Sequence, residues 1–551
     1  MQPAVLDRKQ TSFASFLRTG DNMKSQTYAS VFFKSVTLQC AVLLSVVAVV
    51  FSPCILAGYV DWDDYQVLVS TSLTAHFSAA TIGSIFSSPV LGHYMPLTML
   101  SFLLERTLFG LHPLVSHLIN LLLHCANTML VWSLARALLK DWRKAFFAAL
   151  VFAVHPLHAE SVSWVAERKD MLYALFYLSA LTLYVNRTAA SLRTRGCIML
   201  LFALSLLSKA MAVSLPPLLL ICDYLREGKI TLRHVLEKIP LALAACVFAW
   251  LAILFQGSSG YVVHFSVAKI TAGCILACGN LLFYIWQFFW PHAQSVFYPF
   301  PGSGIYGVPH AYYFAPPVLL VCAWLWLRQR DNISPLGHWG AAFFIITILP
   351  GLQIVPVGRA IAADHFTYIP YIGLILPLTD MAVGFYERMT GNSKKAAACF
   401  CAVWLLMLGV KAHARCAVWH DSITMWSDVI EQNPGLAIAL NNRGIAYAKA
   451  GLYDNACVDY RKALLAAPGS RMIYNNLAVA LAKKGDLHQA ETTALKLTEI
   501  SPDAASFMML GDLRFMRGDR AGAVGAYTKA LSADPGNARA RANLALLCST
   551  K

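Results

Sequence analysis

Acidic side chains crowd into a short polar segment directly after the first apolar run of the sequence. Asp61, Asp63 and Asp64 lie within four residues of one another. Carboxylates this close repel one another, so such a group either holds a cation or binds an incoming proton. A solvated acidic helix cap is the structural alternative.

Histidines and further acids follow in two more segments. His93 precedes Tyr94-Met95-Pro96, and a second polar segment contains His155, His158 and Glu160, followed by Glu167-Arg168-Lys169-Asp170. Imidazole and carboxylate groups at this spacing can ligate a metal or hydrogen-bond a polar substrate. Each histidine taken alone is equally compatible with a packing role in the protein interior.

Lys209 stands between two apolar half-segments within 197–225. A lysine in this position is costly unless an anion meets it, so it indicates an anionic partner. A lysine at a span end that extends its ammonium group to the membrane surface is the alternative.

The elements that position these residues are membrane helices. The chain has 551 residues, of which 58% are hydrophobic and 13% charged, with a mean hydropathy of +0.56. Soluble globular chains are about 25% charged. The composition therefore excludes an ordinary soluble enzyme. The net charge of +15 lies mostly in short loops, as the positive-inside rule produces, so we do not expect nucleic-acid binding.

Apolar stretches predict a polytopic bundle over residues 36–412, preceded by a cytoplasmic basic tail at 1–35. The stretches fall at 36–57, 114–138, 145–160, 171–186, 197–225, 239–256, 269–290, 311–327, 339–357, 366–386 and 396–412. If either 239–256 or 269–290 is re-entrant or interfacial, the basic loops fall on one side. About eleven crossings then place the C-terminal domain outside the cytoplasm.

The last 139 residues, 413–551, are about 20% charged and form a separate soluble domain. Prolines recur there at intervals of 34, 34 and 33 residues, with glycines and alanines in register between them, at Pro434, Pro468, Pro502 and Pro535. This is the tetratricopeptide pattern, and it predicts repeats at about 437–470, 471–503 and 504–537. Such an α-solenoid offers a protein- or peptide-binding surface, to which Asn441, Asn475 and Asn476 are candidate contributors. A packing or dimerisation module is the alternative.

Motif order makes the chain resemble the transmembrane and tetratricopeptide-repeat glycosyltransferases, in particular their bacterial branch. The resemblance rests on the Asp63-Asp64 pair, Pro96-Leu97-Thr98, the Phe109-to-Asn120 motif, the segment from His155 to Val162, Ser208-Lys209, Val296 to Pro299, and Ala363 to Pro370. It extends from about residue 36 to 537.

The resemblance implies an all-α, C-type glycosyltransferase fold. It also implies transfer of a sugar from a polyprenyl-phosphate donor to a protein or glycan on the extracytoplasmic side of the cytoplasmic membrane, as in relatives described as O-mannosyltransferases. Asp63 or Asp64 then matches the family's first-loop carboxylate and is the candidate base, with Glu160 as a supporting group or metal partner. A divalent cation at Asp63, Asp64 and Glu160 is possible. The substrate-binding candidates are His93, His155, His158, Arg168, Lys169, Lys209, Arg359, Asp364 and His365.

Two cations of the family pattern are absent. Tyr94-Met95-Pro96 stands where relatives often have Tyr-Arg-Pro, and Asp364-His365 stands where they often have an acid followed by arginine. Arg359 is a candidate replacement for the second cation. A non-catalytic membrane scaffold whose repeats recruit envelope proteins is the competing hypothesis.

Overall fold

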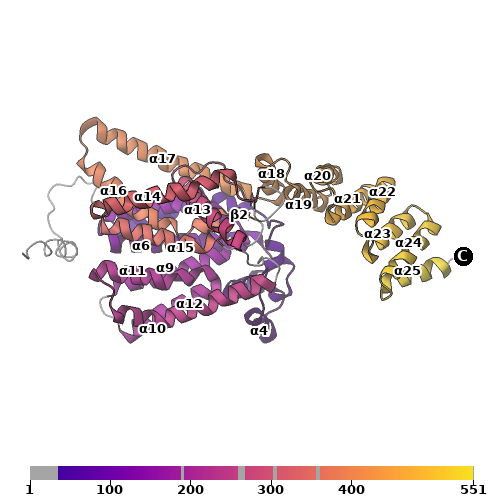
Figure 1. The fold of residues 1–551 in the computed structure, drawn as a ribbon, viewed down its shortest axis with the longest axis horizontal. Coiled ribbons are helices and arrows are strands. Elements are labelled where there is room, and N and C mark those ends of the chain that lie inside the picture. Colours follow the sequence, from indigo (N-terminus) through magenta and orange to yellow (C-terminus); the bar gives the residue numbers. More distant parts are fainter. Residues whose placement is uncertain (1–34, 188–190, 259–266, 302–306, 355–359, 550–551) are drawn as a thin grey trace, which may run out of the picture. The chain divides into compact units, whose positions relative to one another are not determined.

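The computed structural model describes residues 35–549 apart from 188–190, 259–266, 302–306 and 355–359. The chain divides into two compact units, Met1–His420 and Asp421–Lys551 (Figure 1). The helices of the first unit are α3 (Val36–Val50), α4 (Ala79–Ser87), α5 (Pro96–Phe109), α6 (Pro113–Leu139), α7 (Trp142–Val154), α8 (Ala159–Ser163), α9 (Arg168–Asn186), α10 (Leu192–Ser208), α11 (Leu215–Glu227), α12 (Leu232–Ser258), α13 (Val267–Phe289), α14 (Ala315–Gln329), α15 (Pro335–Ile348), α16 (Tyr371–Arg388) and α17 (Gly391–Val418).

Strands are almost absent from the described residues. Tyr298–Pro299 (β1) pairs antiparallel with Ala360–Ala362 (β2), and this is the sheet that the described part of the chain contains. The predicted all-α class is therefore confirmed.

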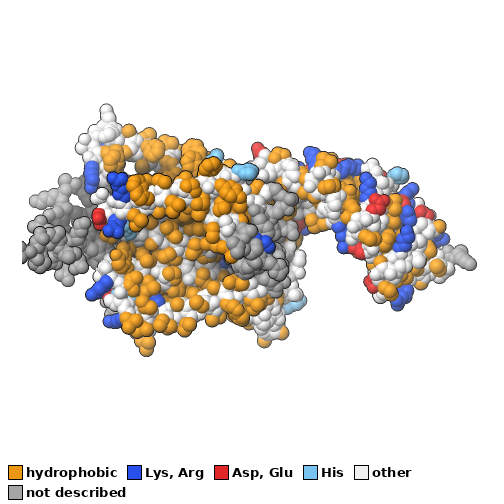
Figure 2. Space-filling view, viewed as in Figure 1, with side chains coloured by type: hydrophobic (Ala, Val, Ile, Leu, Met, Phe, Trp, Pro, Cys, Tyr) orange, Lys and Arg blue, Asp and Glu red, His pale blue; other side chains and the backbone are white. Residues whose placement is uncertain are grey.

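The surface of the first unit is apolar over much of its helical length (Figure 2). Helices α12, α14 and α17 expose many large hydrophobic side chains, including Trp250, Trp324 and Phe400. Five helices are long and apolar enough to cross a membrane, and a sixth span results if α7 and the bent segment Pro156–Ser163 are taken together. The predicted count of about eleven crossings also requires shorter or more polar helices, so that number stays a prediction.

The second unit is a stack of antiparallel helix pairs. Its helices are α18 (Ser422–Gln432), α19 (Ala437–Lys449), α20 (Tyr453–Ala466), α21 (Arg471–Lys484), α22 (Leu487–Ile500), α23 (Ala504–Met516), α24 (Arg520–Ala533) and α25 (Ala538–Ser549). A Cβ at Gly444 would lie 2.5 Å from the Tyr460 ring, and one at Gly511 would lie 2.5 Å from the Tyr527 ring. Glycine in the first helix thus lets the tyrosine of the second pack closely, which explains why these residues keep register in the repeats.

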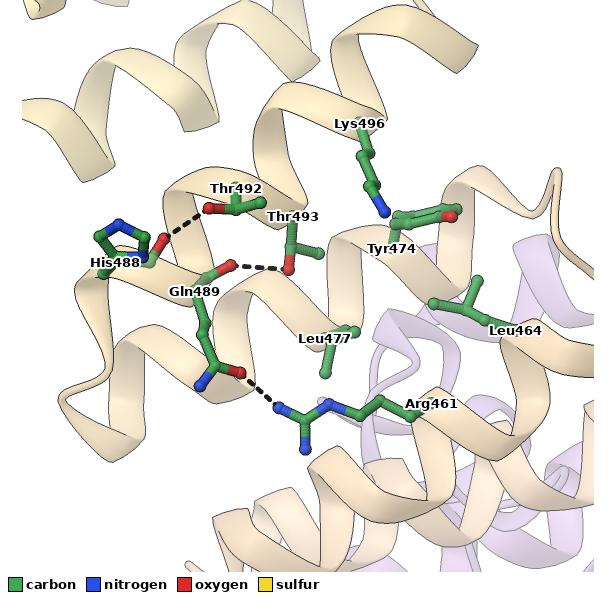
Figure 3. Close-up of a pocket in the computed structure, with 9 residues that line it drawn as sticks. All are labelled: Arg461, Leu464, Tyr474, Leu477, His488, Gln489, Thr492, Thr493 and Lys496. Atoms are coloured by element: carbon green, nitrogen blue, oxygen red, sulfur yellow. Dashed lines mark hydrogen bonds between the residues drawn. The ribbon is translucent and has the colours of Figure 1, made fainter.

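A hollow opens in the second unit beside helices α20, α21 and α22 (Figure 3). Leu464, Leu477 and the Tyr474 ring supply apolar surface, while Arg461 and Lys496 supply positive charge. The Arg461 guanidinium donates to Gln489 at 2.7 Å. Among the asparagines named above, Asn476 donates to buried Asn441 at 3.0 Å, which is bonding between first helices of successive repeats. Asn475 is exposed.

Basic residues gather at one end of the first unit, called here the basic end and formed by segments 140–144, 191–195, 223–238 and 380–388 together with Arg187. Lys144 pairs with Asp380 at 2.6 Å, and Arg143 pairs with Glu387 at 2.7 Å. These ion pairs join the start of α7 to the end of α16. The basic loops that the sequence predicts on one side of the membrane therefore do lie together.

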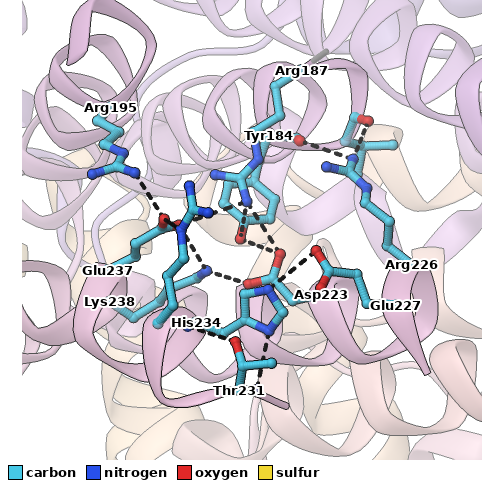
Figure 4. Close-up of polar contacts among 12 residues, drawn as sticks. Tyr184, Arg187, Arg195, Asp223, Arg226, Glu227, Thr231, His234, Glu237 and Lys238 are labelled. Atoms are coloured by element: carbon cyan, nitrogen blue, oxygen red, sulfur yellow. Dashed lines mark hydrogen bonds and ion pairs between the residues drawn. The ribbon is translucent and has the colours of Figure 1, made fainter. Parts of the chain in front are cut away.

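The same end contains a denser polar network between α9, α10, α11 and α12 (Figure 4). Buried Asp223 accepts from the Tyr184 hydroxyl at 2.5 Å and pairs with Arg187 at 3.2 Å and with Lys238. Glu237 pairs with Arg195 at 2.8 Å. The network locks four helix ends together, and a buried carboxylate needs such partners because desolvating it alone is costly.

The opposite end of the first unit, called here the loop end, is formed by segments 57–66, 155–170, 209–214, 290–299 and 360–368. The Ala166 N–H donates to Asp64 at 2.8 Å, and the His365 N–H donates to Glu160 at 3.0 Å. Asn280, in the middle of α13, donates to the carbonyls of Leu352 and Ile361 at 3.3 and 2.8 Å. These bonds join the middle of α13 to the segment that contains β2, and α13 is itself among the helices long and apolar enough to cross a membrane.

The last membrane helix is longer than its apolar run predicts. Helix α17 continues to Val418, and the compact unit ends at His420 rather than at residue 412. The Trp419 ring stacks on Trp164 with centroids 5.2 Å apart, and the Gly58 N–H donates to the His420 carbonyl at 2.8 Å. Residues 413–420 therefore belong structurally with the membrane unit.

Candidate functional site

Asp64 ties the first polar segment to the second. It is 1% exposed, and its two carboxylate oxygens accept the backbone N–H groups of Val60 at 2.9 Å and Ala166 at 2.8 Å. Burial raises the pKa of Asp64 to about 7 despite these two bonds. Because both of its carboxylate oxygens accept backbone N–H groups, Asp64 connects the first polar segment to the second.

Asp63 is the more accessible of the two candidate bases. Its side chain is half-buried, and burial raises its pKa above the usual value, while the nearby cations Lys169 and His365 act in the opposite sense. A carboxylate with a raised pKa is a better proton acceptor near neutral pH than an ordinary aspartate. The geometry therefore favours Asp63 over Asp64 for the chemical role.

Two lysines lie among carboxylates beside Asp63. The Lys169 ammonium pairs with Glu167 at 2.6 Å, and Lys209 lies 3.5 Å from Glu167 and contacts Asp170. Burial raises the pKa of Glu167, but His365, Lys169 and Lys209 together outweigh it and hold the pKa well below its usual range. Lys209 does meet anions, as its position in the sequence indicates, but the anions belong to the protein itself.

Glu160 and His365 form a second pair in the cluster. Glu160 accepts the His365 backbone N–H at 3.0 Å, and its other oxygen lies 3.1 Å from His365 Nδ1. Although burial lowers the pKa of His365, Glu167 and Glu160 raise it by more. His365 is therefore a candidate cation where relatives often have arginine.

The divalent cation predicted at Asp63, Asp64 and Glu160 stays a prediction. Among the described residues, ligand atoms within 4.8 Å of one another come from Glu167, Asp170 and His365 instead. Lys209 already contacts both carboxylates of that group and supplies its positive charge.

Asp364 lies at the edge of the site, against the loop that precedes β1. It accepts from the Tyr298 hydroxyl at 2.7 Å and from the Gln294 amide at 3.1 Å. Burial, followed by the nearby charge of Glu160, raises its pKa to about 7, while Arg415 acts in the opposite sense. Asp364 thus orders residues 294–298 and lies close to the end of α17.

Three of the predicted substrate-binding residues are engaged in contacts with other parts of the protein. His155 stacks on Phe288 and caps the turn at Leu157. His158 lies within hydrogen-bonding distance of the Phe152 carbonyl, at 2.9 Å, and is fully buried. Arg168 pairs with Glu105 at 2.5 Å and donates to Asn120 at 3.0 Å. The Arg168 contacts hold α5, α6 and α9 together.

Of the remaining candidates, His93 is exposed and pairs with Val90 through the backbone. Arg359 lies outside the described residues. The sequence interpretation missed Trp164, Trp419, Lys411 and Arg415. The signal for the last two was available, because both are basic residues at the end of an apolar run; Lys411 lies just before the predicted boundary at residue 412, and Arg415 lies just after it.

Known proteins are similar in sequence to parts of both units. Family models described as Tetratricopeptide repeat match residues 437–470, 473–503 and 508–548. The protein O-mannosyl-transferase TMTC2 of Homo sapiens is 34% identical over 173 residues, which cover 30% of this chain and 21% of that protein. A protein O-mannosyl-transferase of Caenorhabditis elegans is 25% identical over 455 residues, covering 78% of this chain and 62% of the relative.

The resemblance to the transmembrane and tetratricopeptide-repeat glycosyltransferases is confirmed. In these alignments the chain spans only about a fifth of the length of the human relative. Among solved structures, ArnT from Cupriavidus metallidurans bound to undecaprenyl phosphate is 17% identical, with 84% of this chain and 81% of that chain covered and a TM-score of 0.35. A score of this size does not establish a shared fold.

Proposed function

We propose that the chain is a membrane glycosyltransferase that moves a sugar from a polyprenyl-phosphate donor to a hydroxyl of a protein or glycan acceptor outside the cytoplasm. The observation that carries the proposal is the half-buried Asp63, with its raised pKa, beside a cluster of cations at the loop end of an apolar bundle. Similarity to curated O-mannosyl-transferases supports the same reaction class.

The proposed reaction needs a base that accepts a proton and a site that binds the anionic leaving group. The acceptor hydroxyl oxygen attacks the anomeric carbon of the sugar and forms the new glycosidic bond while its proton passes to the Asp63 carboxylate. The bond between the anomeric carbon and the phosphate oxygen breaks, and polyprenyl phosphate leaves with the electron pair. Cations near the phosphate stabilise the charge that develops on this leaving group.

In this proposal the second unit binds the acceptor. The hollow beside α20, α21 and α22 combines apolar surface with the positive charges of Arg461 and Lys496 (Figure 3). Such a surface suits an acidic peptide with one apolar side chain. Solenoids of this type bind extended partners along their surfaces, which supports a role for the repeats in selecting the acceptor.

Glycan mass spectrometry of envelope proteins tests the function directly. Cells that contain the chain should carry hexose-modified peptides that are absent from cells lacking it. Restoring the wild-type gene should return them, whereas restoring an Asp63→Asn variant should not. If the modified peptides are the same with and without the chain, the scaffold hypothesis replaces the enzyme.

Orientation in the membrane gives a second expected result. The basic end joins 140–144 to 380–388 through ion pairs, and basic residues favour the cytoplasmic side. Alkaline phosphatase fused after His420 is therefore expected to be active, since it folds only outside the cytoplasm. The matched fusion after Arg388 should be inactive. The reverse pattern would overturn the proposed side for both the loop end and the repeats.

A further inference from the structure

A tight turn before α5 holds His93 in place. The backbones of Val90 and His93 exchange two hydrogen bonds, each of 2.9 Å, across a turn of two residues. Both turn residues have positive φ, 52° at Leu91 and 76° at Gly92. Glycine adopts this conformation freely, but leucine does so at a cost, and such strain persists only where the surrounding structure fixes the backbone. The position of His93 is therefore well defined.

Helix α5 brings His93 close to the segment that carries Lys209. The helix begins at Pro96, three residues after His93. In its first turn, the Thr98 hydroxyl donates to the Ser208 carbonyl at 3.1 Å. Ser208 directly precedes Lys209, so the start of α5 lies against one of the charged segments of the candidate site.

His93 and Asp63 face the same charged groups from different segments. The charges of Lys169, Glu167 and His365 act on both side chains. Asp63 comes from the first polar segment, and His93 comes from the turn before α5. The candidate base and His93 therefore belong to one site, although about 30 residues separate them in the sequence.

The His93 imidazole is available to an incoming molecule. It is exposed, and it forms no side-chain hydrogen bond or ion pair with any described residue. Three other histidines of the candidate site differ in this respect. His155 and His158 are buried, and His365 pairs with Glu160.

The charge state of His93 limits what it can bind. Although the side chain is open to water, desolvation by the surrounding protein, followed by the charges of Lys169 and Lys209, lowers its pKa. The imidazole is therefore neutral at pH 7, which makes it a weak base and a poor partner for an anion. A neutral imidazole offers one N–H donor and one acceptor nitrogen. These two groups match a hydroxyl group, which also both donates and accepts.

We infer that His93 hydrogen-bonds a hydroxyl group of the donor sugar and so orients the sugar ring beside Asp63. The inference rests on the proposed function for the presence of a lipid-linked sugar. The reacting hydroxyl of the acceptor must contact Asp63, whereas a sugar has several other hydroxyls free for further contacts. A site that hydrogen-bonds a hydroxyl discriminates against analogues that lack it, so His93 contributes to the choice of sugar.

Binding of lipid phosphates to the purified full-length chain in detergent tests the inference. Farnesyl phosphate that carries mannose or glucose is compared with farnesyl phosphate alone, and the hexose conjugate that binds more tightly is used further. His93→Ala is expected to weaken binding of this conjugate by about tenfold, because hydrogen bonds to the sugar are lost. Binding of farnesyl phosphate should remain close to that of wild type, because this lipid has no sugar to contact.

Further variants separate the hydrogen bond from the fold. His93→Gln keeps a donor and an acceptor, so it should bind the conjugate better than His93→Ala does. The control is His76→Ala, which changes an exposed histidine of the same segment between α3 and α5 and should bind normally. Thermal unfolding is measured for every variant. If His93→Ala fails to fold, His93→Phe, which keeps a planar ring without hydrogen-bonding atoms, takes its place.

Deoxy sugars identify the contact itself. Removing the hydroxyl that His93 binds should weaken binding to wild type about as much as His93→Ala does. The same removal should cost the variant nothing further, because the contact is already absent. If every deoxy conjugate loses the same factor in wild type and in His93→Ala, the residue acts only through the local structure, and the inference is overturned.

The two proposals fail in different ways. If a hexose improves binding to wild type and His93→Ala changes nothing, the role of His93 is wrong while the proposed function stands. Equal weakening of farnesyl phosphate and its hexose conjugate by His93→Ala would indicate a contact with the phosphate and would also overturn the inference. If neither hexose improves binding, the sugar donor itself is wrong, and the inference falls with it.

Discussion

Replacing Asp63 with asparagine is expected to lower the rate of sugar transfer by about 10²-fold or more. The substitution keeps the shape of the side chain and removes its ability to accept a proton. Because Asp63 is half-buried and does not tie the loops together, the folded structure should be retained. The measurement is the turnover of a lipid-linked sugar donor by purified wild-type and variant chains, with farnesyl phosphate binding as a check of the donor site.

Asp64→Asn provides the contrasting variant. An amide oxygen can accept from one of the two backbone N–H groups, but the amide nitrogen cannot accept from the other. Leaving a buried donor unsatisfied costs about 1–3 kcal/mol, so this variant should unfold at a lower temperature. Equal stability of the two variants, or normal transfer by Asp63→Asn, would contradict the division of roles between these aspartates.

The pH dependence of transfer follows from the same assignment. Burial raises the pKa of Asp63, so its carboxylate becomes deprotonated at a higher pH than an ordinary aspartate. A general base acts in its deprotonated form. The rate is therefore expected to rise with pH through the pKa of Asp63 and to level off above it, and the rising limb should disappear in Asp63→Asn.

Removing the repeats has the second large expected effect. A chain that ends at His420 keeps α17, the stacked pair of Trp164 and Trp419 and the bond from Gly58 to His420. It should fold and bind farnesyl phosphate as the full chain does. Transfer to a polypeptide acceptor at micromolar concentration should fall by about 10²-fold, because linked binding modules supply effective concentrations near the millimolar range.

A second truncation, which ends earlier in the chain, serves as the control. A chain cut after residue 412 also loses the end of α17 and the stack of Trp419 on Trp164, so it should unfold at a lower temperature than the chain that ends at His420. Undiminished acceptor transfer by the His420 chain would show that the repeats do not present the acceptor. Slow release of sugar to water should remain in that chain, since its membrane unit is complete.

More of the fold than of the site could be predicted from the sequence. Apolar runs and the proline period mark helices and repeats because these signals are local in the sequence. The pairing of Lys209 with Asp170 and of His365 with Glu160 depends on loops far apart in the chain, and spacing does not reveal it. Asp63 and Asp64 are neighbours in the sequence, but only the backbone N–H of Ala166, about 100 residues away, distinguishes their roles.

The junction at His420 has a consequence for how many sugars one acceptor receives. The membrane unit ends at His420 beside Gly58 and Trp164, and α18 begins at Ser422, so very little chain separates the site's loops from the first helix of the repeats. Under the proposed function, an acceptor that stays bound to the repeats after one transfer remains tethered to the membrane unit through this short covalent link while spent lipid is exchanged for fresh donor. Several hydroxyls of one polypeptide would then be modified in a single encounter, giving clustered rather than scattered glycans.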